Sequence, residues 1–225
     1  AQAQVLGVYD ASLTELVGQL KKPRTLWLMV PQAAVDDMLK QLTPLLARSD
    51  TVIDGGNSLY TDSIRRGKML AKKGIVFLDA GVSGGPAGAR NGACIMVGGP
   101  KRAYKKYERL FKDLSVAGGY GYMGECGAGH FVKMVHNGIE YGMMQSLAEG
   151  FALMKKLPFK LNLTEIARLY NHGSVITSRL TGWLADGLKK HGEELAGVSG
   201  SVGVTGEGEW TVAAAKKLKV PAEII

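Results

Sequence analysis

The chain has 225 residues, enough for one large domain or two modest ones, and 46% of them are hydrophobic while 21% are charged. This composition is typical of a globular protein with a sizeable core and argues against a disordered or fibrous chain. The net charge of +8 permits an anionic partner, but the basic residues come as scattered pairs without interleaved aromatic residues, so no nucleic-acid partner is expected.

The first half of the chain alternates between strand and helix patterns. Ser12, followed three residues later by Glu15, forms a capping box that predicts the start of a helix. Short apolar runs predict buried parallel strands, and apolar residues at helical spacing predict the helices between them. In chain order we expect a helix over 12–20, a strand over 24–30, a helix over 33–47, a strand over 51–54, a helix over 61–73, strands over 74–85 and 93–99, and a helix over 101–114.

No strand pattern follows residue 128. One long helix is expected over 129–156, with shorter helices over 161–173 and 178–192, and VPAEII at 220–225 resembles the start of another. We therefore predict an α/β Rossmann-like domain with a parallel sheet over residues 1–127 and an all-α domain over 128–225. Both domains are expected to be incomplete, because the first lacks an opening strand with its glycine fingerprint and the second ends within a helix.

Residues 119–124, GYGYMG, have the G-x-G-x-x-G spacing of a dinucleotide-binding turn. Such a turn follows a strand directly and opens a helix, so that a pyrophosphate lies at the helix N-terminus. Here the preceding DLSVAG is a weak strand, and a further glycine turn, GECGAG, comes before any helix pattern. We interpret GYGYMG as the exit from the sheet domain and not as a cofactor site.

The long helix carries a polar face that can support proton transfer. Lys133, His136, Asn137 and Glu140 have the i, i+3, i+4, i+7 spacing of one helix face. A base and an acid about 10 Å apart on one rigid element suit stepwise proton transfer. A solvated polar face would show the same spacing, and the spacing alone does not separate the two interpretations.

Three turns at the ends of predicted strands favour a site. LMVP (28–31), DGGNS (54–58) and GVSGG (81–85) each follow a strand at its C-terminal end, where open α/β sheets bind ligands. Asn57 and Ser83 offer hydrogen bonds to a polyol or carboxylate there. Gly84 and Gly85 expose backbone amides that an anion can approach.

The cysteines and the lengths of the apolar runs bear on the cellular compartment of the protein. Cys94 and Cys126 lack the number and spacing of a disulfide scaffold, which indicates reduced thiols. No apolar run approaches the roughly 18 residues of a transmembrane helix. The opening AQAQVLGVYD also lacks the basic and apolar parts of a secretory signal. A cytoplasmic protein without a membrane partner is expected.

Taken together, DGGNS, GVSGG, KMVHNGIEYG and TGEGEWT resemble the 6-phosphogluconate dehydrogenase family, in its short bacterial form. The resemblance covers essentially the whole chain. It implies oxidation of 6-phosphogluconate by NAD or NADP, loss of carbon dioxide and release of ribulose 5-phosphate, with no metal. It also implies a homodimer formed through the helical domain.

The same resemblance implies roles for individual residues. Lys133 would be the general base at the C3 hydroxyl, and Glu140 the acid that protonates C1 of the enediol. Substrate contacts are implied for Asn57, Ser83, Gly84, Gly85, His136, Asn137 and Tyr141, the last at the phosphate end. Cofactor contacts are implied for Met29, Val30 and Asn57.

Two alternatives stay open. Non-decarboxylating β-hydroxyacid dehydrogenases, such as the 3-hydroxyisobutyrate type, share a G-x-G-x-x-x-K-x-x-x-N pattern that residues 127–137 also fit. Glu140 and Tyr141 favour the decarboxylating family, because a non-decarboxylating enzyme needs no acid at C1. The second alternative is a truncated, non-catalytic fragment, suggested by the missing glycine fingerprint.

Overall fold

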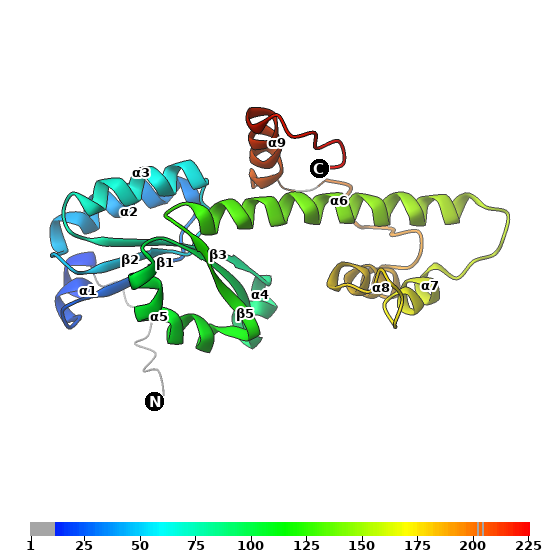
Figure 1. Cartoon of the computed structure of the whole chain (residues 1–225). Coiled ribbons are helices and arrows are strands. Elements are labelled where there is room, and N and C mark those ends of the chain that lie inside the picture. The colour runs from blue at the N-terminus through cyan, green and yellow to red at the C-terminus, as the bar shows by residue number, and fades with distance from the viewer. Residues whose placement is uncertain (1–11, 202, 204) are drawn as a thin grey trace. The chain divides into compact units, whose positions relative to one another are not determined.

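The computed structural model describes residues 12–201, 203 and 205–225. The chain divides into two compact units, residues 1–134 and 135–225. The first unit alternates helices and strands (Figure 1). Its elements are α1 (Leu13–Gln19), β1 (Thr25–Leu28), α2 (Gln32–Leu42), the 3₁₀ turn η1 (Thr43–Leu45), β2 (Thr51–Asp54), α3 (Tyr60–Ala71), β3 (Val76–Ser83), α4 (Gly85–Asn91), β4 (Ala93–Gly98), α5 (Lys101–Leu114) and β5 (Ser115–Gly124).

The five strands form one sheet in the order β1-β2-β3-β4-β5, with an apolar core on each face. Successive side chains of a strand point to opposite faces, and Phe77 and Leu78 of β3 accordingly belong to different cores. Helices α2 and α3 cover the face that contains Phe77, and α5 covers the other. The predicted α/β Rossmann-like architecture is confirmed.

The sheet is not parallel throughout, which corrects the prediction. Strands β1, β2 and β3 are parallel, but β4 runs antiparallel to β3 and β5 is parallel to β4. Only residues 84–92, including the short helix α4, join β3 to β4. A parallel crossover needs a dozen or more residues, so this connection returns the chain as an antiparallel neighbour.

The GYGYMG segment, interpreted above as the exit from the sheet domain, lies inside the strand β5, which the sequence did not predict. It pairs with β4 through Tyr120, Gly121 and Tyr122, so it is extended backbone and opens no helix. The interpretation that it is no cofactor turn agrees with this geometry. Its glycines hid the strand because glycine is depleted in strands in general.

The second unit is helical, as predicted. Helix α6 (Ala128–Lys156) begins in the first unit and continues into the second, where α7 (Leu163–Tyr170), α8 (Arg179–His191) and α9 (Glu207–Leu218) follow. Phe151 of α6 packs with α7 and α8 around Ala167 and Leu188. The expected helix start at 220–225 is wrong: these residues form no helix and follow the left-handed C-cap of α9 at Lys219 (φ 56°).

Candidate functional site

Met29 and Val30, expected at the cofactor, follow β1 beside the turn that follows β2. The Gly55 amide donates to the Leu28 carbonyl over 2.9 Å, which extends the pairing of β1 and β2 by one residue. A Cβ atom on Gly56 would lie 2.7 Å from the Val30 carbonyl oxygen. The Met29 side chain is 63% exposed at this edge. The fold therefore brings the end of β1 and the DGGNS turn together.

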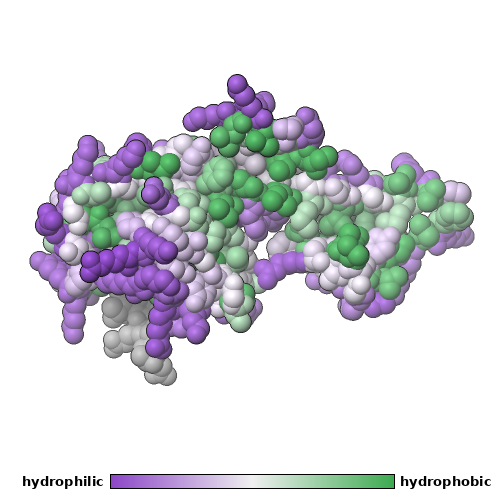
Figure 2. Space-filling view, in the orientation of Figure 1, coloured by the Kyte–Doolittle hydropathy of each residue, from purple (hydrophilic) through white to green (hydrophobic). Residues whose placement is uncertain are grey.

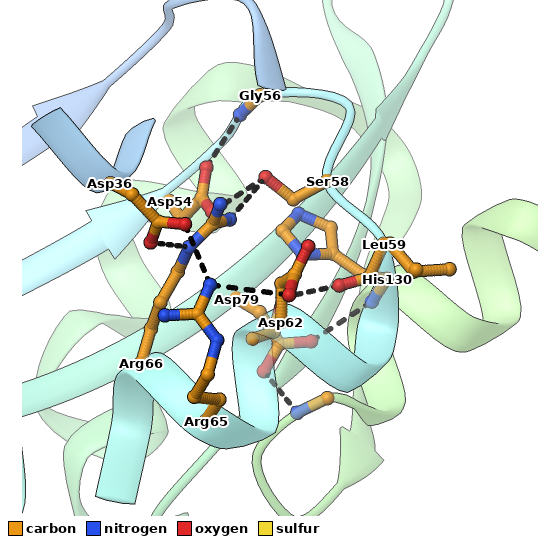
Figure 3. Close-up of polar contacts among 12 residues, drawn as sticks. Asp36, Asp54, Gly56, Ser58, Leu59, Asp62, Arg65, Arg66, Asp79 and His130 are labelled. Carbon is orange, nitrogen blue, oxygen red and sulfur yellow. Dashed lines mark hydrogen bonds and ion pairs between the residues drawn. The ribbon is translucent and has the colours of Figure 1, made fainter. Parts of the chain in front are cut away.

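The DGGNS turn is anchored by Asp54, whose carboxylate is fully buried (Figure 3). One carboxylate oxygen accepts the Gly56 amide at 3.2 Å, and the other accepts the Ser58 hydroxyl at 2.8 Å. Arg66 adds an ion pair to Asp54 at 3.3 Å. Asn57 is half-buried and lies between these two anchored positions, so its backbone has little freedom.

Arg66 is a residue of the site that the sequence analysis missed. It is 1% exposed, and its guanidinium donates to Ser58 Oγ at 2.9 Å and to Asp36 Oδ1 at 2.9 Å. The hydrogen bond from Arg66 lowers the pKa of Asp36 to about 2, with help from Arg65. A signal was available, because Ser63, Arg66 and Leu70 share the buried face of α3 at i, i+3 and i+7 spacing.

Lys133, the expected general base, lies against the last part of β3. A Cβ atom on Gly81 would overlap the Lys133 Cβ, so only a glycine lets the helix approach the strand here. Ser83 follows two residues later, and Gly84 and Gly85 have positive φ values of 132° and 57°. The GVSGG turn and the Lys133 helix, distant in sequence, are thus neighbours.

The first turn of α6 is bound to the sheet through Asp79. This buried carboxylate accepts the amides of Gly127 at 2.7 Å and His130 at 2.9 Å, which stabilises the positive end of the helix dipole. A Cβ atom on Gly129 would overlap the carbonyl oxygens of Met96 and Asp79. The helix therefore starts in direct contact with the strands, one turn before Lys133.

Helix α3 also contacts this turn. His130 is 2% exposed, and its Nδ1 lies 2.7 Å from Ser63 Oγ. Cys126 donates its thiol hydrogen to the Ser63 carbonyl over 3.2 Å, and burial raises the pKa of this thiol to about 12. Ser63 and His130 are 67 residues apart, so no local pattern in the sequence predicts their contact.

The second unit holds the remaining polar residues of α6. His136 Nδ1 lies 2.9 Å from Asn137 Oδ1 and 3.8 Å from Glu140 Oε2. Asn137 Nδ2 donates to Glu207 Oε1 on α9 over 2.6 Å. Hydrogen bonds and an ion pair therefore connect His136, Asn137 and Glu140 in one network. The expectation did not include Glu207.

Tyr141 is half-buried beside the same segment of α9. A Cβ atom on Gly208 would lie 3.3 Å from the Tyr141 ring. The ring therefore packs on the start of α9, which carries the TGEGEWT motif of the sequence.

Possible metal ligands and membrane-spanning helices were sought among the described residues. Among them, no group of three or more His, Cys, Asp or Glu side chains is arranged to hold a metal ion. None of the helices in the described part of the chain has the length and apolar character required to span a bilayer.

Two family models match the chain. Residues 2–126 match the model described as the NAD binding domain of 6-phosphogluconate dehydrogenase. Residues 129–225 match the model described as the 6-phosphogluconate dehydrogenase C-terminal domain.

Relatives carry the same family name. The Bacillus subtilis (strain 168) protein YqeC, whose name assigns it provisionally to these dehydrogenases, is 46% identical over 95% of this chain and 72% of its own length. The NAD(+)-dependent, decarboxylating 6-phosphogluconate dehydrogenase of Haloferax volcanii is 41% identical over 95% of this chain and 71% of its own. The sheep enzyme is also 41% identical, but the match spans only 48% of it.

Solved structures agree. The Plasmodium falciparum 6-phosphogluconate dehydrogenase, solved in its apo form, with NADP+ and with 6-phosphogluconate, aligns with a TM-score of 0.85 and 35% identity. The alignment covers 93% of this chain and 47% of that one. A 3-hydroxyisobutyrate dehydrogenase from Salmonella typhimurium has a TM-score of 0.70 at 18% identity over 89% of this chain and 69% of its own, a likeness of fold alone.

Proposed function

The chain belongs to the 6-phosphogluconate dehydrogenase family, and from this premise we propose that it catalyses the oxidative decarboxylation of 6-phosphogluconate to ribulose 5-phosphate and carbon dioxide. The observation that carries the proposal is the packing of Lys133 against Gly81, the first residue of the GVSGG segment. Lys133 lies on the helix that also bears Glu140. The chain spans about seven-tenths of the Haloferax enzyme and about half of the sheep enzyme, so activity of these 225 residues is part of the proposal.

The edge of the sheet fits a nicotinamide cofactor. Met29 offers exposed apolar surface there, the Val30 carbonyl lies close to Gly56 of the DGGNS turn, and Asn57 belongs to that anchored turn. We assign cofactor contacts to these three residues and take NAD or NADP as the cofactor. When bound, nicotinamide supplies the acceptor for the hydride that leaves C3 of the substrate.

Lys133 is assigned the role of general base. In its neutral form it takes the C3 hydroxyl proton as the C3 hydride leaves, which produces a 3-keto acid. Lys133 then returns that proton to the C3 oxygen while the bond between C1 and C2 breaks and carbon dioxide departs. The electrons of that bond form the enediol, so no metal is needed to hold them.

Glu140 is assigned the role of acid. It protonates the terminal carbon of the enediol, and the enediol hydroxyl proton returns to Lys133 as the ketone forms. The seven residues between Lys133 and Glu140 correspond to a rise of about 10 Å along α6, enough for a sugar acid to lie between them. His136, 3.8 Å from the Glu140 carboxylate, supports its charge when protonated.

Further contacts and boundaries complete the assignment. Gly84 and Gly85 would expose amides to the substrate carboxylate, and Tyr141 would reach the phosphate end. We assign residues 1–127 to the cofactor domain and 128–225 to the helical domain. Substrate contacts are assigned to Asn57, Ser83, Gly84, Gly85, His136, Asn137 and Tyr141.

We include a homodimer and a cytoplasmic location in the proposal, and exposed apolar side chains of the helical unit support the dimer. Leu153, Phe159 and Trp183 are 68%, 67% and 53% exposed. Figure 2 shows further hydrophobic residues at the surface of this part of the chain. Sedimentation of the natural gene product tests the dimer.

The state of the cysteines is compatible with the proposed cytoplasmic location. Cys94 and Cys126 are both free, as expected in a reducing compartment.

Turnover of the Lys133→Met variant tests the catalytic assignment. We expect 6-phosphogluconate oxidation to fall by at least about a thousandfold, because the base is lost while a side chain of similar length remains. Lys156→Met, an exposed lysine on the same helix, is the matched control and should keep full activity. Retained turnover in a folded Lys133→Met protein would refute the role.

Carbon dioxide release separates the proposal from its alternatives. A non-decarboxylating β-hydroxyacid dehydrogenase would reduce the cofactor without releasing carbon dioxide. A non-catalytic fragment would show neither, and would give no fluorescence change when titrated with NADH or NADPH.

A further inference from the structure

Glu207 is a buried acid for which the proposed reaction has no use. It is the first residue of α9 and is only 4% exposed. Its Oε1 accepts a hydrogen bond from Asn137 Nδ2 at 2.6 Å, while its Oε2 has no hydrogen-bond partner among the described residues. Helix α9 approaches α6 closely here, since a Cβ atom on Gly138 would lie 2.7 Å from Thr211 Cγ2. A buried carboxylate is costly, which calls for a reason beyond packing.

The hydrogen bond from Asn137 has a definite direction. Asn137 Nδ2 donates to Glu207 Oε1, so the amide directs its NH₂ group to the carboxylate. The amide oxygen then points the other way, toward His136 Nδ1 at 2.9 Å. Because an amide oxygen also only accepts, His136 must carry a proton on Nδ1.

The series of polar contacts from Glu207 through Asn137 and His136 extends to Glu140, the proposed acid. His136 Nδ1 lies 3.8 Å from Glu140 Oε2, one helical turn further along α6. A reversed Asn137 amide would present its NH₂ to His136 and would favour the other tautomer. Glu207, as the acceptor of the Asn137 NH₂ group, therefore favours one of the two orientations of the Asn137 amide and, through it, one tautomer of His136.

We propose that Glu207 is a positioning residue of the active site: it orients the Asn137 amide and thereby holds His136 in the Nδ1-protonated form beside Glu140. The kinetic consequence of this inference rests on the proposed function. The orientation of the two side chains does not, and it can be measured without turnover.

The ring nitrogens of His136 give the first test. In the full chain labelled with ¹⁵N-histidine, at about pH 8 where imidazole is mostly neutral, the spectrum should show His136 protonated on Nδ1. Its signals are identified by their loss in a His136→Gln variant, since the chain has four histidines. Protonation on Nε2 in the native chain overturns the proposal, and this measurement needs no Glu207 variant to fold.

A variant gives the second test. In Glu207→Leu the carboxylate is lost, and the His136 signals should move toward a mixture of both tautomers. Glu149→Leu, which removes an exposed carboxylate from α6, is the matched control and should leave them unchanged. Unchanged His136 signals in a folded Glu207→Leu protein would also overturn the proposal.

Kinetics give the third test, through a double-mutant cycle. Glu207→Leu should lower kcat/KM for 6-phosphogluconate about tenfold, with the KM for the cofactor unchanged. In an Asn137→Ala background the same change should cost less than about twofold, because Glu207 would act through Asn137. An equal loss in both backgrounds would indicate a merely structural role and overturn the proposal.

The outcomes separate the inference from the function. If the native protein does not oxidise 6-phosphogluconate, the proposed function fails while the histidine spectra still decide the orientation. If the native protein is active and Glu207→Leu acts equally in both backgrounds, the inference fails while the function stands.

Discussion

Arg66 is a cation with almost no exposure, held by two carboxylates of unequal burial. Asp54 is fully buried, whereas the side chain of Asp36 is 49% exposed. The two carboxylates and the Ser58 hydroxyl accept hydrogen bonds from the Arg66 guanidinium. Without these partners, burial of its charge would cost much free energy. The consequence reaches the candidate site, because the same contacts hold the turn that carries Asn57.

Asp36 predicts a pH dependence of stability. The hydrogen bond from Arg66 lowers its pKa to about 2 in the folded chain, from the ordinary value of 3.8. A depressed carboxyl pKa stabilises the folded state above the unfolded value, and this stabilisation is lost as pH falls through about 4 toward 2. Asp36→Asn should cost about 1 kcal/mol at neutral pH, a modest value because solvent screens the half-exposed group.

Urea unfolding at neutral pH and at about pH 2.5 checks this expectation. The difference between Asp36→Asn and the native chain should shrink at the lower pH. Asp37→Asn, which alters the neighbouring exposed carboxylate, is the control. A difference that stays constant with pH would contradict the assigned pKa.

At the scale of elements, the contact between α6 and the sheet defines the position of Lys133. Asp79 accepts two amides of the first turn, and glycine at 129 and at 81 permits the helix to touch the strands. Because helix and strand are rigid, a side chain on α6 is positioned more precisely than one on a loop.

Gly81→Ala should separate α6 from β3. The added methyl group overlaps the Lys133 Cβ, so we expect a loss of about 1–3 kcal/mol in the free energy of unfolding, with a larger relative loss of turnover. Gly150→Ala is the matched control on α6, where a Cβ atom would meet nothing within 4 Å. It should stabilise the chain by about 0.5–1 kcal/mol.

Urea unfolding and steady-state kinetics measure both variants. Equal stability of Gly81→Ala and the native chain would mean that the helix relaxes without cost at this contact.

At the scale of the whole molecule, two compact units share one continuous helix. The cysteines both lie in the first unit and differ in environment: Cys94 is exposed, whereas Cys126 is partly buried beneath α3. Thiol reactivity therefore reports on the folding of this unit alone.

Thiol labelling at about pH 8 should be biphasic. The thiolate is the reactive form, and burial raises the pKa of Cys126 to about 12, so this residue should react at least about a hundredfold more slowly than Cys94. In denaturing urea both should react quickly. A Cys94→Ala variant isolates the slow phase, and fast labelling of that folded variant would contradict the burial of Cys126.

Local signals in the sequence were sufficient for most elements. The capping box at Ser12, the strand at 51–54 and the helix at 101–114 were predicted correctly, because caps, apolar runs and helical periodicity act over a few residues. The α/β and helical halves and the family follow from the same kind of evidence. The polar face of α6 was also visible, since helical spacing alone brings its residues together.

Tertiary structure alone decided which strands run antiparallel and which polar groups are buried. The direction of β4 depends on the short return through residues 84–92, and β5 was hidden by its glycines. The partners of Arg66, His130 and Asn137 lie 8 to 70 residues away in sequence, at distances that no local pattern encodes. A buried charge is stable only where distant elements supply its hydrogen bonds, and the sequence lists those groups without saying which of them meet.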